Sequence, residues 1–216
     1  MAGTGSGGSG PIGVGATTGD PAVHPGTRIG HVHLRVADLE RAIGFYHGVL
    51  GFEVTQRWGD HAAFLSAGGY HHHLGLNTWQ SRGGSPPAPG TTGLYHLAIL
   101  YPTRRELADA LRRLIAAGIR LDGASDHGVS EALYLRDPDG NGVELYADRD
   151  PADWLRDAEG GLVMGSEPID LADLLAELDG PAPGRTSVSL VCQTPCRPAR
   201  GRVAPTARDS VARLSR

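Results

Sequence analysis

Hydrophobic and polar residues alternate in short runs along the middle of the chain, and glycine or polar turns separate the runs. Residues 28–36 read RIGHVHLRV, with one apolar face and one face that carries two histidines, and this period of two predicts a β-strand. Apolar residues then recur at helical spacing from an N-cap at Asp38 to a stop at Gly51. Three short β-compatible runs follow, so this part of the chain predicts the order β-α-β-β-β.

The same order of elements returns after a Pro/Gly-rich linker at residues 81–92. A strand, a glycine-terminated helix that opens at Thr103 and three more strands follow the linker, and His96 stands 65 residues after His31. Such an internal repeat is typical of a fold built from copies of one unit. We therefore expect an α+β fold in which two tandem βαβββ modules form a half-open, mainly antiparallel β-barrel with one concave face.

The strongest turn signal lies between the last two predicted strands. Residues 137–142 read DPDGNG, which supplies a proline to preset φ, Asx side chains that bond nearby backbone, and glycines for positive φ. In the return strand Glu144 points to the face opposite Val143 and Leu145, which isolates one carboxylate. A glutamate in such a strand lies on a solvated face, or is paired or bound to a metal, and this stretch alone leaves both open.

Composition divides the 216 residues into segments. These are a disordered Gly/Ser/Thr-rich leader (1–26), a two-module domain (27–150, with modules at 27–80 and 93–150 and the linker at 81–92), an extension with an amphipathic helix (151–180) and a disordered basic tail (181–216). The tail holds seven arginines against one acidic residue. No aromatic or helical pattern accompanies this charge, so we expect no nucleic-acid partner.

Other features of the sequence bear on location. No run approaches the roughly 18 apolar residues of a membrane span, and the leader lacks the basic and apolar regions of a signal peptide. The only cysteines, Cys192 and Cys196, lie in the tail, so the body has no disulfide framework and suits a reducing compartment. We therefore expect a cytoplasmic protein without a membrane partner.

Two histidines and one glutamate occupy matching places in the predicted modules. On the repeat pairing, His31 and His96 lie in the first strands of the two copies and Glu144 lies in the last strand of the second. Two imidazoles and a carboxylate around one concave face are the donors of a 2-His-1-carboxylate site, which leaves positions open for a substrate and O₂. A lone histidine on a strand is more often structural, but the repeat-equivalent pair with an isolated glutamate favours a metal site inside the half-open barrel.

The two modules resemble a known family. RIGHVHLRVADLERAIGFYHGVLGFEV and GLYHLAILYPT with DHGVSEALYLRDPDGNGVELY are similar to the vicinal oxygen chelate superfamily, which includes glyoxalase I, bleomycin-resistance proteins and type I extradiol ring-cleaving dioxygenases. Within the resemblance, which covers roughly Thr27 to Asp150, FLSAGGYHHHLGLNTW and ASDHGVSEALYLRDPDGNGVELY most resemble bacterial catechol 2,3-dioxygenases. It implies Fe(II), or else Mn(II) or another divalent metal, with His31, His96 and Glu144 as ligands.

The resemblance also implies residues that act on the substrate. His72, within the run His71 to His73, resembles the histidine that acts as acid/base, although the sequence leaves open which of the three faces the site. His127 and Tyr134 resemble the residues that hydrogen-bond the substrate oxygen attached to iron. These side chains suit the roles, because histidine titrates near neutrality and a tyrosine hydroxyl can donate to a phenolate oxygen.

Gly75 helps to choose among the activities of the superfamily. Alignment of HLGL with GVEL puts it where glyoxalase-type members usually have a fourth ligand, and glycine cannot ligate. We expect an extradiol dioxygenase that uses O₂ on a catechol or related aromatic diol in aromatic compound catabolism. The alternatives are a glyoxalase-like metal-dependent isomerase or lyase and a bleomycin-resistance-type binding protein. The helix expected at Ile169 to Leu178 could cover the sheet or a partner subunit, which leaves a homo-oligomer open.

Overall fold

A computed structural model of the chain describes residues 22–180. Most of the expected leader and the whole basic tail, including both cysteines, lie outside the described residues, so the predictions for those segments stay predictions. None of the helices in the described range is both long and apolar enough to cross a membrane.

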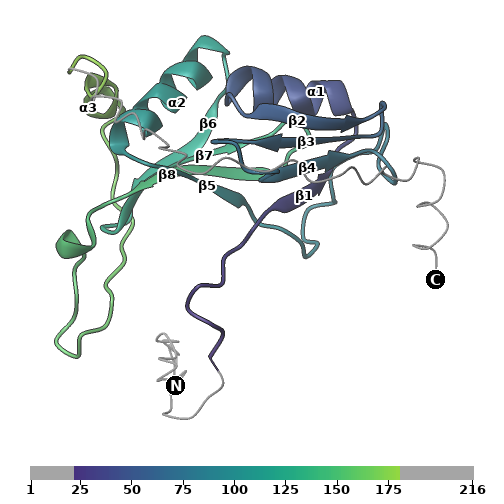
Figure 1. Cartoon of the computed structure of the whole chain (residues 1–216). Helices are drawn as coiled ribbons and strands as arrows, with labels where there is room; N and C mark the ends of the chain where they lie inside the picture. The colour runs from purple at the N-terminus through teal and green to yellow at the C-terminus, as the bar shows by residue number, and fades with distance from the viewer. Residues whose placement is uncertain (1–21, 181–216) are drawn as a thin grey trace, which may run out of the picture. The chain divides into compact units, whose positions relative to one another are not determined.

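Two successive βαβββ modules make up most of the described chain (Figure 1). The first contains β1 (Val32–Arg35), α1 (Leu39–Ile43), the helical segment η1 (Gly44–Val49), β2 (Glu53–Trp58), β3 (Ala62–Ser66) and β4 (Leu74–Asn77). The second contains β5 (Leu97–Tyr101), α2 (Arg104–Ala116), β6 (Leu121–Asp126), β7 (Ser130–Arg136) and β8 (Gly142–Asp148). The internal repeat and the α+β class predicted from the sequence are confirmed.

Each module forms its own four-stranded mixed sheet. The strand orders are β1-β4-β3-β2 and β5-β8-β7-β6, and in each sheet the first pair is parallel and the others are antiparallel. The strands β1 and β5 are therefore edge strands. No hydrogen-bonded ladder among the described strands joins the two sheets, so a closed barrel is not formed.

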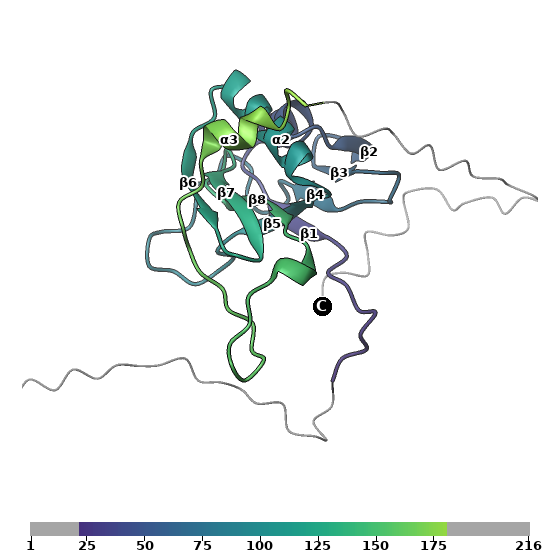
Figure 2. The ribbon, with the colours of Figure 1, turned by 90° about the vertical axis from the view of Figure 1, so that its left-hand side faces the viewer.

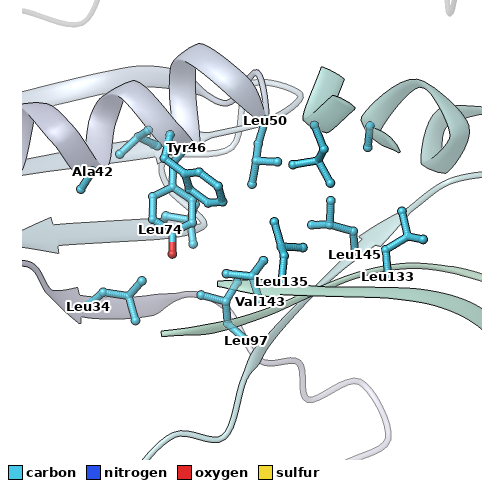
Figure 3. Packing of buried hydrophobic residues seen from close by; sticks show 14 of the residues in the cluster. Leu34, Ala42, Tyr46, Leu50, Leu74, Leu97, Leu133, Leu135, Val143 and Leu145 are labelled. Atoms are coloured by element: carbon cyan, nitrogen blue, oxygen red, sulfur yellow. The ribbon is translucent and has the colours of Figure 1, made fainter. Parts of the chain in front are cut away.

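Both sheets bury one face beneath the helices. The helices α1 and α2 lie on the same side of the sheets (Figure 1), and Leu34, Leu97 and Leu145 point from the strands into one continuous apolar cluster (Figure 3). Burial of this kind contributes roughly 1.5–3 kcal/mol for each large side chain. The opposite face of each sheet, called the open face below, carries the polar residues of the strands.

The turn between β7 and β8 also connects the modules. As predicted, Asp137 accepts hydrogen bonds from backbone N–H groups of the turn, and Gly140 has φ of +80°. Asp137 also accepts a hydrogen bond of 2.9 Å from the Tyr46 hydroxyl in the first module. Asp139 accepts from Ala37 N at 3.0 Å and pairs with Arg41 at 2.6 Å. One turn of the second module thus contacts the N-terminus of α1 and, through Tyr46, the segment η1.

Several element boundaries differ from the sequence predictions. The predicted caps are present, because Asp38 accepts from Arg41 N and Thr103 accepts from Arg105 N. The first helix, however, widens into the π-helical segment η1, which contains two glycines that disfavour a regular α-helix. The run of histidines before β4 lies in a loop, and His31 and His96 each lie one residue before a strand.

The extension after β8 packs its helix on the second module. It contains a short 3₁₀ turn, η2 (Pro151–Asp153), a loop that runs out and back, and α3 (Leu171–Ala176), which lies beside α2 (Figure 2). Leu174 of α3 is fully buried, and Arg104 of α2 binds Asp173 at 2.8 Å and Glu177 at 2.7 Å. A helix is therefore present within the range predicted at Ile169 to Leu178, but it is shorter and packs on α2 instead of on the sheet.

Candidate active site

His96 and Glu144 meet on the open face of the second sheet. The register of β5 and β8 pairs Ala98 with Glu144, so His96, two residues before Ala98, lies on the same face. His96 Nε2 lies 2.9 Å from Glu144 Oε2. The side chain of Glu144 is only 13 % exposed, so solvent has little access to this carboxylate.

Gly142 allows this close approach. A Cβ atom at Gly142 would overlap the carbonyl oxygen of Tyr95 and lie 3.0 Å from His96 Cβ. The start of β8 therefore lies against the chain that carries His96, and only glycine fits there. His96 Nδ1 is buried and makes no hydrogen bond to another described residue. Because nothing in the described chain fixes its tautomer, Nε2 can present a proton to Glu144 or a lone pair to a cation.

The hydrogen bonds continue from Glu144 through two more side chains. The Tyr134 hydroxyl lies 3.1 Å from Glu144 Oε1 and 2.6 Å from His127 Nε2. His127 Nδ1 lies 2.7 Å from the carbonyl oxygen of Gly165. Burial and the neighbouring Glu144 carboxylate raise the pKa of Tyr134 to about 12, so its phenol keeps its proton at neutral pH. A continuous chain of polar contacts therefore runs from His96 to Gly165.

The candidate acid/base histidine lies on the first module. The ring of His72 packs at a tilt against His31, with centroids 4.5 Å apart, and edge-on against Phe64 at 5.1 Å. His71 contacts His72 through their Nδ1 atoms at 2.8 Å, whereas His73 turns to the Ser66 hydroxyl at 3.1 Å. Of the three consecutive histidines, His72 is thus the one that contacts His31. Partial burial, and then the nearby histidines, lower the pKa of His72 from its usual value.

Sequence reasoning missed an aromatic group on the open face of the first sheet. His33 lies 5.9 Å from Phe64 and 5.7 Å from Trp79 between ring centroids, and Trp58 lies 5.4 Å from Phe64. His33 pairs with Gly75 across β1 and β4, and a Cβ atom at Gly75 would lie 2.8 Å from the His33 ring. The usable signal was strand alternation, since residue 33 shares a face with residue 31.

Two cavities border His96. One, of about 410 Å³, is lined by His96, His127 and Tyr134 on the open face of the second sheet. The other, of about 920 Å³, lies between the edge strands β1 and β5 and reaches towards the helices. The smaller cavity holds three of the predicted site residues and lies within the usual size range for small-ligand sites, so we assign the chemistry to it.

The predicted site residues thus fall into two groups. His96, Glu144, Tyr134 and His127 form one chain of contacts, and His31 pairs with His72. Within residues 22–180, no group of three or more His, Cys, Asp or Glu side chains is close enough to hold a metal ion. The joint ligation by His31, His96 and Glu144 therefore stays a prediction.

Comparisons with known proteins agree with this architecture. The chain is 47% identical over 156 residues to the catechol-2,3-dioxygenase of Bacillus subtilis (strain 168), which covers 72% of this chain and 54% of that protein. It is 37% identical over 123 residues to biphenyl-2,3-diol 1,2-dioxygenase 3 of Rhodococcus globerulus, covering 56% of this chain and 63% of that protein. The chain thus spans between about half and two thirds of the length of these relatives.

A solved structure and a family model extend the comparison. A glyoxalase/dioxygenase from Nostoc punctiforme, 21% identical, shares the fold with a TM-score of 0.50 over 61% of this chain and 99% of that one. The model of the Glyoxalase/Bleomycin resistance protein/Dioxygenase superfamily matches residues 28–145, which run from just before β1 into β8 and make up more than half of the chain. The chain therefore belongs to the glyoxalase/bleomycin resistance protein/dioxygenase superfamily.

Proposed function

We propose that the protein is a metal-dependent extradiol ring-cleaving dioxygenase that acts on a catechol or a related aromatic diol with O₂. The observation that carries the proposal is the chain of contacts from His96 through Glu144 and Tyr134 to His127. Three of these residues, His96, Tyr134 and His127, line one cavity. The chain of contacts combines two candidate ligands with two hydrogen-bonding groups. The names of the two dioxygenase relatives, catechol-2,3-dioxygenase and biphenyl-2,3-diol 1,2-dioxygenase, support the same reaction class.

The metal in this proposal is Fe(II), with Mn(II) as the alternative, and its ligands are His31, His96 and Glu144. The donors fit a divalent cation in kind: two imidazoles and a carboxylate. The unpartnered Nδ1 of His96 adds support, because it leaves the ring free to turn a lone pair at Nε2 to a cation. When bound, the metal supplies the redox chemistry that lets O₂ react with an aromatic ring, which side chains do not provide.

The side chains bind, orient and exchange protons with the diol. Tyr134 is kept protonated by its raised pKa, and in the substrate complex its hydroxyl would turn from His127 to donate a hydrogen bond to a substrate oxygen beside Glu144. His72 has a lowered pKa, so its ring is neutral at pH 7 and able to accept a proton from the diol.

The same geometry disfavours a glyoxalase-like reaction. A glyoxalase-like enzyme would need a fourth protein ligand at residue 75, which is glycine here. The ring of His33 occupies the space beside this glycine. A three-ligand site leaves more positions open for a chelating diol and O₂.

The test combines metal binding with turnover. Protein purified without oxygen is loaded with Fe(II), and bound iron is measured for wild type, Glu144→Ala and the control Tyr146→Phe, which alters a neighbour two residues along the same strand face. Wild type and Tyr146→Phe are expected to hold one iron per chain, and Glu144→Ala to hold none while remaining folded. Equal iron in Glu144→Ala and wild type would show that the ligand assignment is wrong.

Turnover is then followed as oxygen uptake and as the yellow ring-cleaved semialdehyde. The iron-loaded wild type is expected to consume O₂ with at least one member of a panel of substituted catechols. Iron-loaded protein that consumes none across the panel contradicts the dioxygenase proposal and favours a binding protein.

A further inference from the structure

The C-terminal extension reaches the candidate active site through paired backbone contacts. Gly165 N–H donates to the His127 carbonyl at 3.1 Å, and the Gly165 carbonyl lies 2.7 Å from His127 Nδ1. Next to this pair, Asp126 and Glu167 exchange two backbone hydrogen bonds of 2.8 and 2.9 Å. The extension lies beyond residues 28–145, which match the superfamily model. A segment outside the part that matches the superfamily model thus touches a residue of the site.

The Gly165 carbonyl determines the tautomer of His127. A carbonyl oxygen has lone pairs and no proton, so the contact at His127 Nδ1 exists only when Nδ1 carries the hydrogen. In the neutral ring the other nitrogen, Nε2, then has a lone pair and can only accept. The single hydroxyl proton that Nε2 faces belongs to Tyr134.

Tyr134 has one proton and two acceptors within reach. The distance to His127 Nε2 is 2.6 Å and the distance to Glu144 Oε1 is 3.1 Å. With His127 in the Nδ1–H tautomer, the contact of 2.6 Å is a phenol-to-imidazole hydrogen bond, whereas 3.1 Å is long for an O–H···O hydrogen bond to Glu144. The proton is thereby directed away from Glu144, and the oxygen that faces Tyr134, Oε1, stays available to a cation.

Ion pairs hold the extension in this position. Arg149 pairs with Asp126 at 2.5 Å and with the buried Glu131 at 2.9 Å. Arg104 joins Glu131 to the acidic residues of α3 and its C-terminus, so both ends of the extension are anchored. The Gly165 carbonyl is thus held by a fixed frame.

We propose that Gly165 is a positioning residue of the active site: its carbonyl holds His127 in the Nδ1–H tautomer, which draws the Tyr134 proton to His127 and leaves Glu144 free to ligate the metal. The importance of this arrangement for turnover rests on the proposed function, whereas the tautomer of His127 is independent of it.

The first test measures the tautomer without any turnover. Long-range ¹H–¹⁵N correlation spectra of the metal-free, ¹⁵N-labelled protein at about pH 8, above the usual histidine pKa of about 6.5, report which ring nitrogen carries hydrogen. The His127 signals are those lost in His127→Gln. We expect hydrogen on Nδ1 in wild type, and hydrogen on Nε2 there would overturn the proposal.

Two variants of Gly165 separate the carbonyl contact from general packing. Gly165→Ala keeps the N–H group, its φ is not positive, and the added Cβ meets nothing within 4 Å, so we expect an unchanged tautomer. Gly165→Pro loses the N–H bonded to His127 and displaces the pairing. We expect a mixture of tautomers in Gly165→Pro, and a purely Nδ1–H ring in this folded variant would contradict the proposal.

Metal affinity gives a second readout. In Gly165→Pro the Tyr134 proton is free to bond Glu144, so the Mn(II) dissociation constant should rise about tenfold, the lower end of the usual effect for groups that support a ligand. In a Tyr134→Phe background no proton competes, and Gly165→Pro should leave Mn(II) affinity unchanged. An equal loss in both backgrounds would show a merely structural effect. Absence of oxygen uptake by wild type would contradict the proposed function while leaving the tautomer result intact.

Discussion

From the hydrogen bond between Tyr46 and Asp137 we predict how much the contact between the modules stabilises the fold. Tyr46 lies in the first module and is fully buried, and Asp137 lies in the turn between β7 and β8 and is 4 % exposed. Their oxygens are 2.9 Å apart. Burial and the nearby Asp137 raise the pKa of Tyr46, so the hydroxyl donates at all ordinary pH values. Tyr46→Phe removes this donor with almost no change in shape.

The expected loss of stability follows from the partners that remain. A hydrogen bond to a charged group contributes about 1.5–3 kcal/mol. Asp137 Oδ2 keeps a second donor, the side-chain amide of Asn141 at 2.9 Å, so the carboxylate is not left bare. We therefore expect Tyr46→Phe to lower the free energy of unfolding by about 1.5–2 kcal/mol. For a domain of this size, this corresponds to a decrease in Tm of about 3–8 °C.

Thermal and urea unfolding of the metal-free protein measure this change. Tyr101→Phe is the control, because Tyr101 packs partly buried against the same core and burial raises its pKa to about 12, but no hydrogen bond of its hydroxyl is found among the described residues. We expect the control to melt within error of wild type. If Tyr46→Phe also melts with wild type, the bond does not stabilise the contact between the modules and the reasoning is wrong.

Three further predictions concern the site and its supports. Gly142→Ala should sharply weaken metal binding and lower Tm, because the new methyl group displaces His96. The control Gly123→Ala, where a Cβ meets nothing within 4 Å, should change neither metal binding nor Tm, and metal titration and calorimetry measure both. Arg149 lowers the pKa of Asp126, so this pair stabilises the fold above about pH 4, and its contribution is lost as the pH falls through the lowered pKa. Acid unfolding of Arg149→Met should therefore show a smaller loss of unfolding free energy over that pH range than wild type shows. His72→Phe should slow turnover by about 10² to 10⁴ with little change in catechol affinity, which single-turnover and binding measurements separate.

The elements of the fold could be predicted because their signals are local. Strand alternation, the caps at Asp38 and Thr103 and the turn at 137–142 each depend on neighbours in sequence, and all are present. The bond from Tyr46 to Asp137 could not be predicted, since it joins residues 91 apart through packing. The contact between His127 and Gly165 could not be predicted from the sequence either, because it also joins residues far apart in the chain.

The candidate site could be predicted only in part. Placing His96 beside Glu144 requires the parallel register of β5 and β8, which follows from the repeat once the modules are recognised. The position of His31 relative to these two residues depends on how one sheet packs against another without a shared ladder. Side-chain volumes in the core decide that packing, and no residue spacing encodes it.

The pairing of His33 with Gly75 constrains how this site could acquire another metal ligand. The Cβ atom of Gly75→Glu would lie 2.8 Å from the ring of His33, so the new side chain would clash with that ring. Either the His33 ring has to shift, or a smaller residue has to replace it. The path from the proposed three-donor site to one with four donors therefore involves position 33 as well as position 75.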